Sequence, residues 1–263
     1  MDRFIDGCIL GSVAIVSGAA DRFGLTAEDA RFADNEALYV ACHNGHTGVA
    51  RWLTERFELT AADARSANNR ALRAAAHNGH LPTAVWLAER FQLTAADARA
   101  GDNKALRVSC HKGHLEFAKW LVGRFDLGVA DARARDNEAL HWACIKGHLD
   151  VAKWLVDRFD LTAADARADG NKALRWTCRN GHLKVAQWLA TTFALTAADV
   201  RRPDGKNKIL RVACSRGHTE LAQWIVDRFH LTNEEISPYP QLRPAMPFRV
   251  PDTCARSICA HSI

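Results

Sequence analysis

The sequence has no apolar run long enough to cross a membrane. A membrane-spanning helix needs about 20 consecutive apolar residues, and the 263-residue chain has no such segment. It also lacks a glycine-rich phosphate loop and any recognisable spacing of nucleophile, base and orienting residue. The net charge of +5 is a small excess that matters only if it gathers on one face. We therefore expect no membrane span, no catalytic residues, no cofactor and no enzymatic activity.

Cysteine is present, but its spacing argues against disulfide bonds. Six of the eight cysteines occupy one position of a repeating pattern: Cys8, Cys42, Cys110, Cys144, Cys178 and Cys214. Equivalent atoms in stacked helices lie about 8–10 Å apart, whereas a disulfide needs Cα atoms within about 7 Å. We predict small buried apolar residues in a reducing compartment, and hence a cytoplasmic protein.

The pattern itself is a Gly-His pair followed by tryptophan and then phenylalanine. The glycines are Gly45, Gly79, Gly113, Gly147, Gly181 and Gly217, each followed by histidine. Tryptophan comes seven residues after each glycine and phenylalanine five residues later. The period is 34 residues, except for a last step of 36. A fixed period of this length is typical of a solenoid, in which each repeat packs only on its neighbours.

One unit, from Asp136 to Arg167, shows the expected parts. Asparagine precedes the first helix and is predicted to be its N-cap, at Asn35, Asn69, Asn103, Asn137, Asn171 and Asn207. Gly147 is expected to end that helix in the left-handed conformation. The second helix is expected from Leu149 to Phe159, with tryptophan in the core. A Thr-x-x-Asp capping box then predicts a helical turn in the connection.

These features predict an all-α solenoid of about seven stacked helix pairs. We place the units near 1–34, 35–68, 69–102, 103–136, 137–170, 171–206 and 207–235, with a proline-rich, disordered tail at 236–263. The apolar stretch 8–20 has some features of a secretory signal. It is better interpreted as a divergent first repeat, because Gly11 lies 34 residues before Gly45. Processing of this stretch stays open.

The strings GHLEFAKWL at 113–121, GHLDVAKWL at 147–155 and GHLKVAQWL at 181–189 resemble the Gly-His turn and second helix of ankyrin repeats. The resemblance covers roughly residues 1–235. The family's Thr-Pro is absent throughout, and a Leu-Thr-x-x-Asp-Ala-Arg segment replaces its β-hairpin finger. The resemblance implies a protein-binding scaffold that uses its concave side, with helical turns in place of the fingers.

The first helices are rich in basic residues, which suggests a binding surface. The candidate partner-binding residues are Arg73, Lys104, Arg107, Lys112, Trp142, Lys146, Arg175, Trp176, Arg179, Arg211 and Arg216. The tryptophans among them could be binding anchors or could fill gaps between repeats. The arginines could instead be neutralised by the Asp-Ala-Arg aspartates. If they are not, we expect a monomer that binds a protein with an acidic surface, or alternatively an anionic ligand or nucleic acid.

Two other patterns have a structural interpretation that we favour over a functional one. Cys42-His43 with His46, and Cys110-His111 with His114, contain zinc-ligand residue types, but four converging ligands are needed and the pattern fails in other units. We expect no metal site, and hydrogen bonds between successive turns from the Gly-His histidines. The repeated Asp-Ala-Arg is predicted to form an ion-pair ladder between units.

Overall fold

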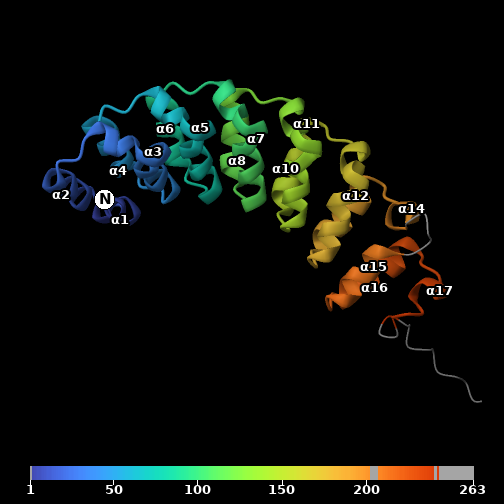
Figure 1. Cartoon of the computed structure of the whole chain (residues 1–263). Coiled ribbons are helices and arrows are strands. Elements are labelled where there is room, and N and C mark those ends of the chain that lie inside the picture. Colours follow the sequence, from blue (N-terminus) through green and yellow to red (C-terminus); the bar gives the residue numbers. More distant parts are fainter. Residues whose placement is uncertain (1, 202–206, 240–241, 243–263) are drawn as a thin grey trace, which may run out of the picture.

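The computed structural model describes residues 2–201, 207–239 and 242, and within these ranges the chain is helical and has no strand. The helix pairs stand in a row that bends into an arch (Figure 1). The opening pair is α1 (Asp2–Leu10) and α2 (Val13–Phe23). The first helices of later units are α3 (Ala27–His43), α5 (Ala61–Asn78), α7 (Ala95–Lys112), α10 (Ala134–Ile145), α12 (Ala163–Arg179) and α15 (Lys208–Ser215). The second helices are α4 (Thr47–Arg56), α6 (Leu81–Arg90), α8 (Leu115–Phe125), α11 (Leu149–Phe159), α13 (Leu183–Thr192) and α16 (Thr219–Phe229). Three short helices form separate connections: α9 (Val129–Ala132), α14 (Ala197–Val200) and α17 (Asn233–Ile236).

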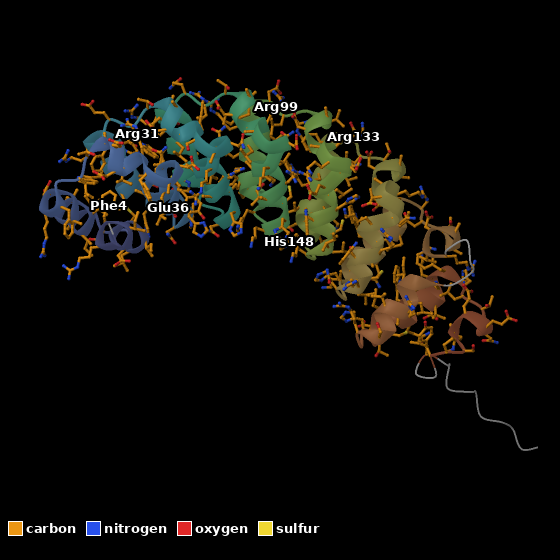
Figure 2. The ribbon with its side chains drawn as sticks, viewed as in Figure 1. Phe4, Arg31, Glu36, Arg99, Arg133 and His148 are labelled. Atoms are coloured by element: carbon orange, nitrogen blue, oxygen red, sulfur yellow. The ribbon has the colours of Figure 1, made fainter. Side chains whose placement is uncertain are left out.

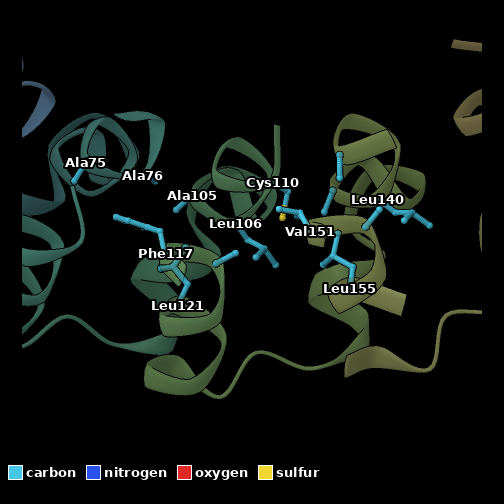
Figure 3. Packing of buried hydrophobic residues seen from close by; sticks show 14 of the residues in the cluster. Ala75, Ala76, Ala105, Leu106, Cys110, Phe117, Leu121, Leu140, Val151 and Leu155 are labelled. Carbon is cyan, nitrogen blue, oxygen red and sulfur yellow. The ribbon is translucent and has the colours of Figure 1, made fainter. Parts of the chain in front are cut away.

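The core runs along the row as one continuous layer between first and second helices. Leu106 and Leu140 of the first helices and Leu121 and Leu155 of the second are at most 1% exposed. Figure 3 shows these side chains between neighbouring helix pairs. Each repeat thus buries its apolar residues against its own partner helix and the adjacent units, as the solenoid prediction requires.

The helical turn predicted in each connection is confirmed. Thr162 caps it, and the Asp165 carboxylate accepts from the Thr162 backbone N–H at 2.8 Å. The same reciprocal box starts α3, α5, α7, α14 and α17. These turns stand where the ankyrin resemblance would place a β-hairpin.

The predicted asparagine N-cap is wrong for the five complete inner units. Between the connecting turn and the first helix, three consecutive residues adopt a left-handed helical conformation, for example Gly101, Asp102 and Asn103 with φ between 58° and 63°. The asparagine is the last and buried member of this left-handed turn. Non-glycine residues avoid this region, and asparagine and aspartate tolerate it best. Only Asn207 caps as expected, accepting from the Leu210 N–H at 2.9 Å.

The predicted link between successive Gly-His turns is confirmed. His148 Nε2 lies 3.1 Å from the carbonyl oxygen of His111, one unit earlier, and His114 makes the equivalent bond to His77. The His148 ring lies against Gly113, where a Cβ would come within 2.6 Å of it. Gly113 also has φ +80°. Glycine is therefore required at this turn for two separate reasons.

The cysteines and tryptophans occupy the core as predicted. Cys8, Cys42, Cys110, Cys144 and Cys178 are buried, and Cys214 is half-buried. Burial raises the pKa of the Cys110 thiol to about 12, which keeps it protonated and unreactive. Each second-helix tryptophan packs edge-on against the phenylalanine five residues later, from Trp52 to Trp224.

The structure describes the N-terminal stretch 8–20 but little of the C-terminal stretch 236–263. Stretch 8–20 forms parts of the packed pair α1 and α2, with Val16 buried, so it is structured as a first repeat. Most of the tail predicted for 236–263 lies outside the described residues. The unit limits themselves stay a prediction.

Candidate functional site

The outer edge of the arch carries the predicted ion-pair ladder. Figure 2 shows Arg99 and Arg133 along this edge and His148 at the opposite, inner edge. Each Asp-Ala-Arg arginine, and Arg201 of the equivalent Asp-Val-Arg segment, donates to a carboxylate of the next unit at 2.7–2.8 Å. The rungs are Arg31–Asp63, Arg65–Asp97, Arg99–Asp131, Arg133–Asp165, Arg167–Asp199 and Arg201–Glu235. The arginine bonds lower the pKa of Asp165 to about 2.

The ladder corrects one alternative from the sequence. These aspartates do not neutralise the first-helix arginines, because each buried carboxylate already serves its own capping box and the arginine of the preceding rung. Asn69, at the end of a left-handed turn, adds a bond of 3.4 Å to Asp97 of the next unit. In the described part of the chain, the positive charge of the first helices is therefore balanced elsewhere or left unbalanced.

We define the first-helix surface as the side chains at the positions of Glu36, Tyr39, Val40 and His43 in α3, together with their equivalents in the later first helices. Two pockets open on it. The first, of about 280 Å³, lies among α3, α5 and α7, and the second, of about 170 Å³, lies between α12 and α15. This surface contains most of the candidate partner-binding residues.

Arg107 is mostly buried and makes its hydrogen bonds to other residues of the chain. Its side chain is 10% exposed and pairs with Glu138 of the next unit. Its Nε donates to the carbonyl of Asp102 at 2.8 Å and its Nη2 to that of Gly101 at 2.9 Å. Trp142 donates its indole N–H to the same Glu138 carboxylate at 3.0 Å. Arg107 is thus a clamp on the left-handed turn, and Trp142, half-buried against the His111 ring, completes the arrangement.

Arg73 lies at the same position one unit earlier but has no carboxylate partner among the described residues. Its Nη2 donates to the carbonyl of Ala67 in its own left-handed turn at 3.0 Å. One unit before Glu138, the equivalent position is occupied by Lys104. Arg73 and Lys104 both line the larger pocket. Burial and the charge of Arg70 lower the pKa of Arg73, which remains a cation.

Arg175, Trp176 and Arg179 meet at the smaller pocket with two apolar residues of α15. Arg175 Nη2 donates to the carbonyl of Asp169 at 3.0 Å, while its buried Nε has no hydrogen-bond partner. The Arg179 guanidinium stacks 4.7 Å from the centre of the Trp176 ring, and Trp176 is 38% exposed. Sequence reasoning selected all three residues, and the structure brings them together.

The remaining candidates are spread along the surface. Lys112 and Lys146 are exposed at the Gly-His ends of α7 and α10, and Arg211 and Arg216 are exposed on and just after α15. They extend the positive surface without belonging to either pocket.

Several pocket residues were not selected from the sequence. Tyr39, His43 and His77 line the larger pocket, with the two imidazole rings stacked at 5.8 Å. Ile209 and Val212 form the apolar wall of the smaller one. Tyr39 shares its repeat position with Arg73, His43 and His77 share theirs with Arg179, and Val212 shares its position with Trp176, so a list made by position would have found these four. Ile209 aligns with an alanine in the other units and could not have been found in this way.

The residues that the structure describes contain neither a metal-binding cluster nor a membrane-spanning helix. No group of three or more histidine, cysteine, aspartate or glutamate side chains gathers there in a way that could hold a metal ion. Cys42 is buried in the core, and His46 is bonded to the carbonyl of Ile9. None of the helices in that part of the chain combines the length and the apolar character of a membrane span.

Repeats similar to those of this chain occur in known proteins. The family model for ankyrin repeats, in three copies, matches residues 90–165 and 106–204. The chain contains ankyrin repeats. Its repeats have helical turns where the resemblance to the family implies β-hairpins.

The fold is shared with a solved structure. The human ASB11 ankyrin repeat domain matches with a TM-score of 0.59 at 17% identity, over 83% of this chain and 95% of that domain. An ankyrin repeat family protein from Legionella pneumophila also matches, with a TM-score of 0.41 at 18% identity, over 85% of this chain and 70% of that one. Comparison with curated proteins gives no sequence match.

Proposed function

We propose that this ankyrin-repeat chain is a non-enzymatic scaffold that binds a partner protein through its first-helix surface. Ankyrin repeats generally mediate protein–protein interaction, which sets the class of function. The partner is expected to present acidic groups, because the surface contributes cations that the next repeat does not neutralise.

The observation that carries this proposal is the contrast between Arg107 and its equivalents. Arg107 finds Glu138, whereas Arg73 and Arg175 find only backbone carbonyls. A carbonyl bond fixes a guanidinium in place without cancelling its charge. Such a pre-positioned cation loses little conformational freedom on binding an anion, which favours recognition. Both residues line pockets, so a partner's side chain has room to reach them.

A scaffold also fits the distribution of chemistry better than an enzyme does. The reactive side-chain types are repeated by position and serve packing or ladders, as Cys110 and His148 do. Catalysis requires different groups that converge on one reacting atom. The proposed cytoplasmic location rests on the buried, unpaired cysteines.

Site-specific photo-crosslinking tests the proposal. A crosslinking amino acid replaces Lys112, which follows His111 at the end of α7 and borders the first-helix surface, or, as a matched control, the exposed Lys153 on α11. In cells that make the protein, we expect a discrete partner adduct from position 112 that Lys146→Glu weakens, and no such adduct from position 153. Equal adducts from both positions, or none from position 112, would contradict the proposal.

Salt dependence separates a protein partner from nucleic acid. Binding that loses most of its strength between low and ~0.3 M salt, whatever the sequence of an added oligonucleotide, would indicate phosphate contacts. Binding of one protein that persists at ~0.3 M salt is the expected result, since screening is then severe for exposed charges.

A further inference from the structure

The pocket between α12 and α15 contains donors without acceptors. Arg175 Nε is buried and has no hydrogen-bond partner. A buried N–H that is left unpaired destabilises a protein, because it has lost its hydrogen bonds to water and gained none in return. The Trp176 indole N–H also makes no hydrogen bond within the described residues, in contrast to Trp142. The residue four positions before Trp176 is Lys172, which cannot accept a hydrogen bond.

Elsewhere in the protein, a carboxylate satisfies an arginine and a tryptophan at these two repeat positions. Around Glu138, one carboxylate accepts from the guanidinium of Arg107 through Oε2 and from the indole N–H of Trp142 through Oε1. Lysine replaces Glu138 at the equivalent positions of the next two units, Lys172 and Lys208. Lysine therefore occupies both relevant positions: position 208, which corresponds to Glu138 as seen from Arg175, and position 172, which corresponds to Glu138 as seen from Trp176. Both donors line the smaller pocket, and neither has a carboxylate partner among the described residues.

The other residues that line the pocket are suited to contact an apolar side chain. Ile209 and Val212 form an apolar wall, and the flat Trp176 ring is partly open. Arg179 adds a second positive charge and keeps the ring in place by stacking on it. The volume of about 170 Å³ suits a single side chain.

We propose that this pocket binds a glutamate or aspartate side chain of a partner protein, with an apolar residue beside it packing on Trp176, Ile209 and Val212. The proposal rests on the proposed function and names the chemistry of one contact within it. Arg175 binds the carboxylate as Arg107 binds Glu138, and the indole N–H of Trp176, the next residue on the same helix, is a second donor at the pocket. The partner's carboxylate thus takes the place of an internal one that the repeat lacks.

The test uses two dipeptides that differ only in charge, N-acetyl-Glu-Leu-amide and N-acetyl-Gln-Leu-amide. The readout is the NMR signal of the Trp176 indole N–H, assigned with a Trp176→Phe variant of the full chain. We expect the glutamate peptide to shift this signal with saturation in the millimolar range, which corresponds to about 4 kcal/mol of binding free energy. The glutamine peptide should shift it at least about tenfold less, because it brings no charge to the guanidinium.

Three variants make the test specific. Arg175→Gln should weaken the response at least tenfold. Lys208→Glu should abolish it by offering Arg175 a carboxylate from its own chain, as Glu138 does for Arg107. Lys153→Gln, which removes an equal charge at the exposed control position on α11, should leave the response unchanged. Circular dichroism verifies that each variant is folded.

Three results would overturn the inference: equal shifts with both dipeptides, a full response in folded Arg175→Gln, or tighter binding of inorganic phosphate than of the glutamate peptide. Crosslinking at position 112 is independent of this pocket. A partner adduct without a dipeptide response would therefore refute the pocket alone. A dipeptide response without any adduct would refute the scaffold function and leave the pocket chemistry intact.

Discussion

The outer edge and the first-helix surface use the same residue, arginine, to opposite effect. On the outer edge, Arg99 and its five equivalents each meet a carboxylate of the next unit, so the charges balance and hold the stack together. On the first-helix surface, Arg107 meets a carboxylate but Arg73 and Arg175 do not. The residue one repeat away thus decides whether an arginine is structural or is available to a partner.

Substituting the two kinds of first-helix arginine should give the largest contrast. Arg107→Gln removes the partner of Glu138 and two bonds to the left-handed turn, and is expected to lower the free energy of unfolding by about 2–3 kcal/mol. Arg175→Gln removes one carbonyl bond from a half-buried side chain and should lower it by less than about 1 kcal/mol. Urea unfolding measures both, and equal losses would show that the two arginines have one role.

On the outer edge, the carboxylate should matter more than the arginine. Asp131 is 7% exposed, accepts from Gly128 N–H at 2.8 Å and holds Arg99 through both oxygens. Asp131→Asn is expected to lower the free energy of unfolding by about 2 kcal/mol, since a charged hydrogen-bond network loses its charge. Asp126→Asn, at an exposed residue nearby, is the control and should change stability by less than about 0.5 kcal/mol.

The two regions should also respond differently to acid. Burial lowers the pKa values of His111 and His141 to about 4, so these rings stay neutral in the folded protein. Below pH 6.5 the unfolded chain binds protons that the folded one does not, and stability falls until about pH 4. The ladder carboxylates, such as Asp165 with its pKa of about 2, add a second loss as pH falls from 3.8 toward 2.

Unfolding curves at several pH values between 7.5 and 2.5 check this order. His141→Gln should flatten the first step and leave the second unchanged, while Asp165→Asn should reduce only the second. A single transition below pH 4 in the wild-type protein would contradict the contribution of the buried histidines.

The smallest effect is expected for a single rung of the ladder. The Arg99 side chain is 44% exposed, so solvent screens its attraction to Asp131. At low salt, Arg99→Gln should lower the free energy of unfolding by clearly less than Asp131→Asn does. This loss should shrink in 1 M sodium chloride, where the screening length is about 3 Å. A loss as large as that of Asp131→Asn would mean that the rung, and not the capping box, carries the stability.

The stack and its ladders could be predicted from the sequence because they depend on period. Gly147, Trp154 and Thr162 recur with fixed spacing, and each has one dominant structural role in a helix pair. The left-handed turns could not be predicted in the same way. Asn103 suits both an N-cap and a left-handed residue, and local propensity alone does not separate the two.

The signal that was available lies in the two residues before each asparagine. They include Gly101 and Asp102 in one unit and Asp169 and Gly170 in another, which are residue types that tolerate positive φ. The pairing of Arg107 with Glu138 also needed coordinates, because the two residues are 31 positions apart and belong to different units. A list of basic residues by repeat position places Arg107 with Arg73 and Arg175. The three differ only in whether the next unit provides a carboxylate, as it does for Arg107.

A double-mutant cycle on Arg73 and position 104 tests the central claim most directly. Lys104→Glu places a carboxylate where Glu138 stands for Arg107, and Arg73→Gln removes the cation, so urea unfolding of the wild type, both single variants and the double variant isolates their interaction. The account predicts a favourable coupling of about 1 kcal/mol or more between Arg73 and the new glutamate. A coupling of zero would contradict the claim that the neighbouring repeat decides the role of each first-helix arginine.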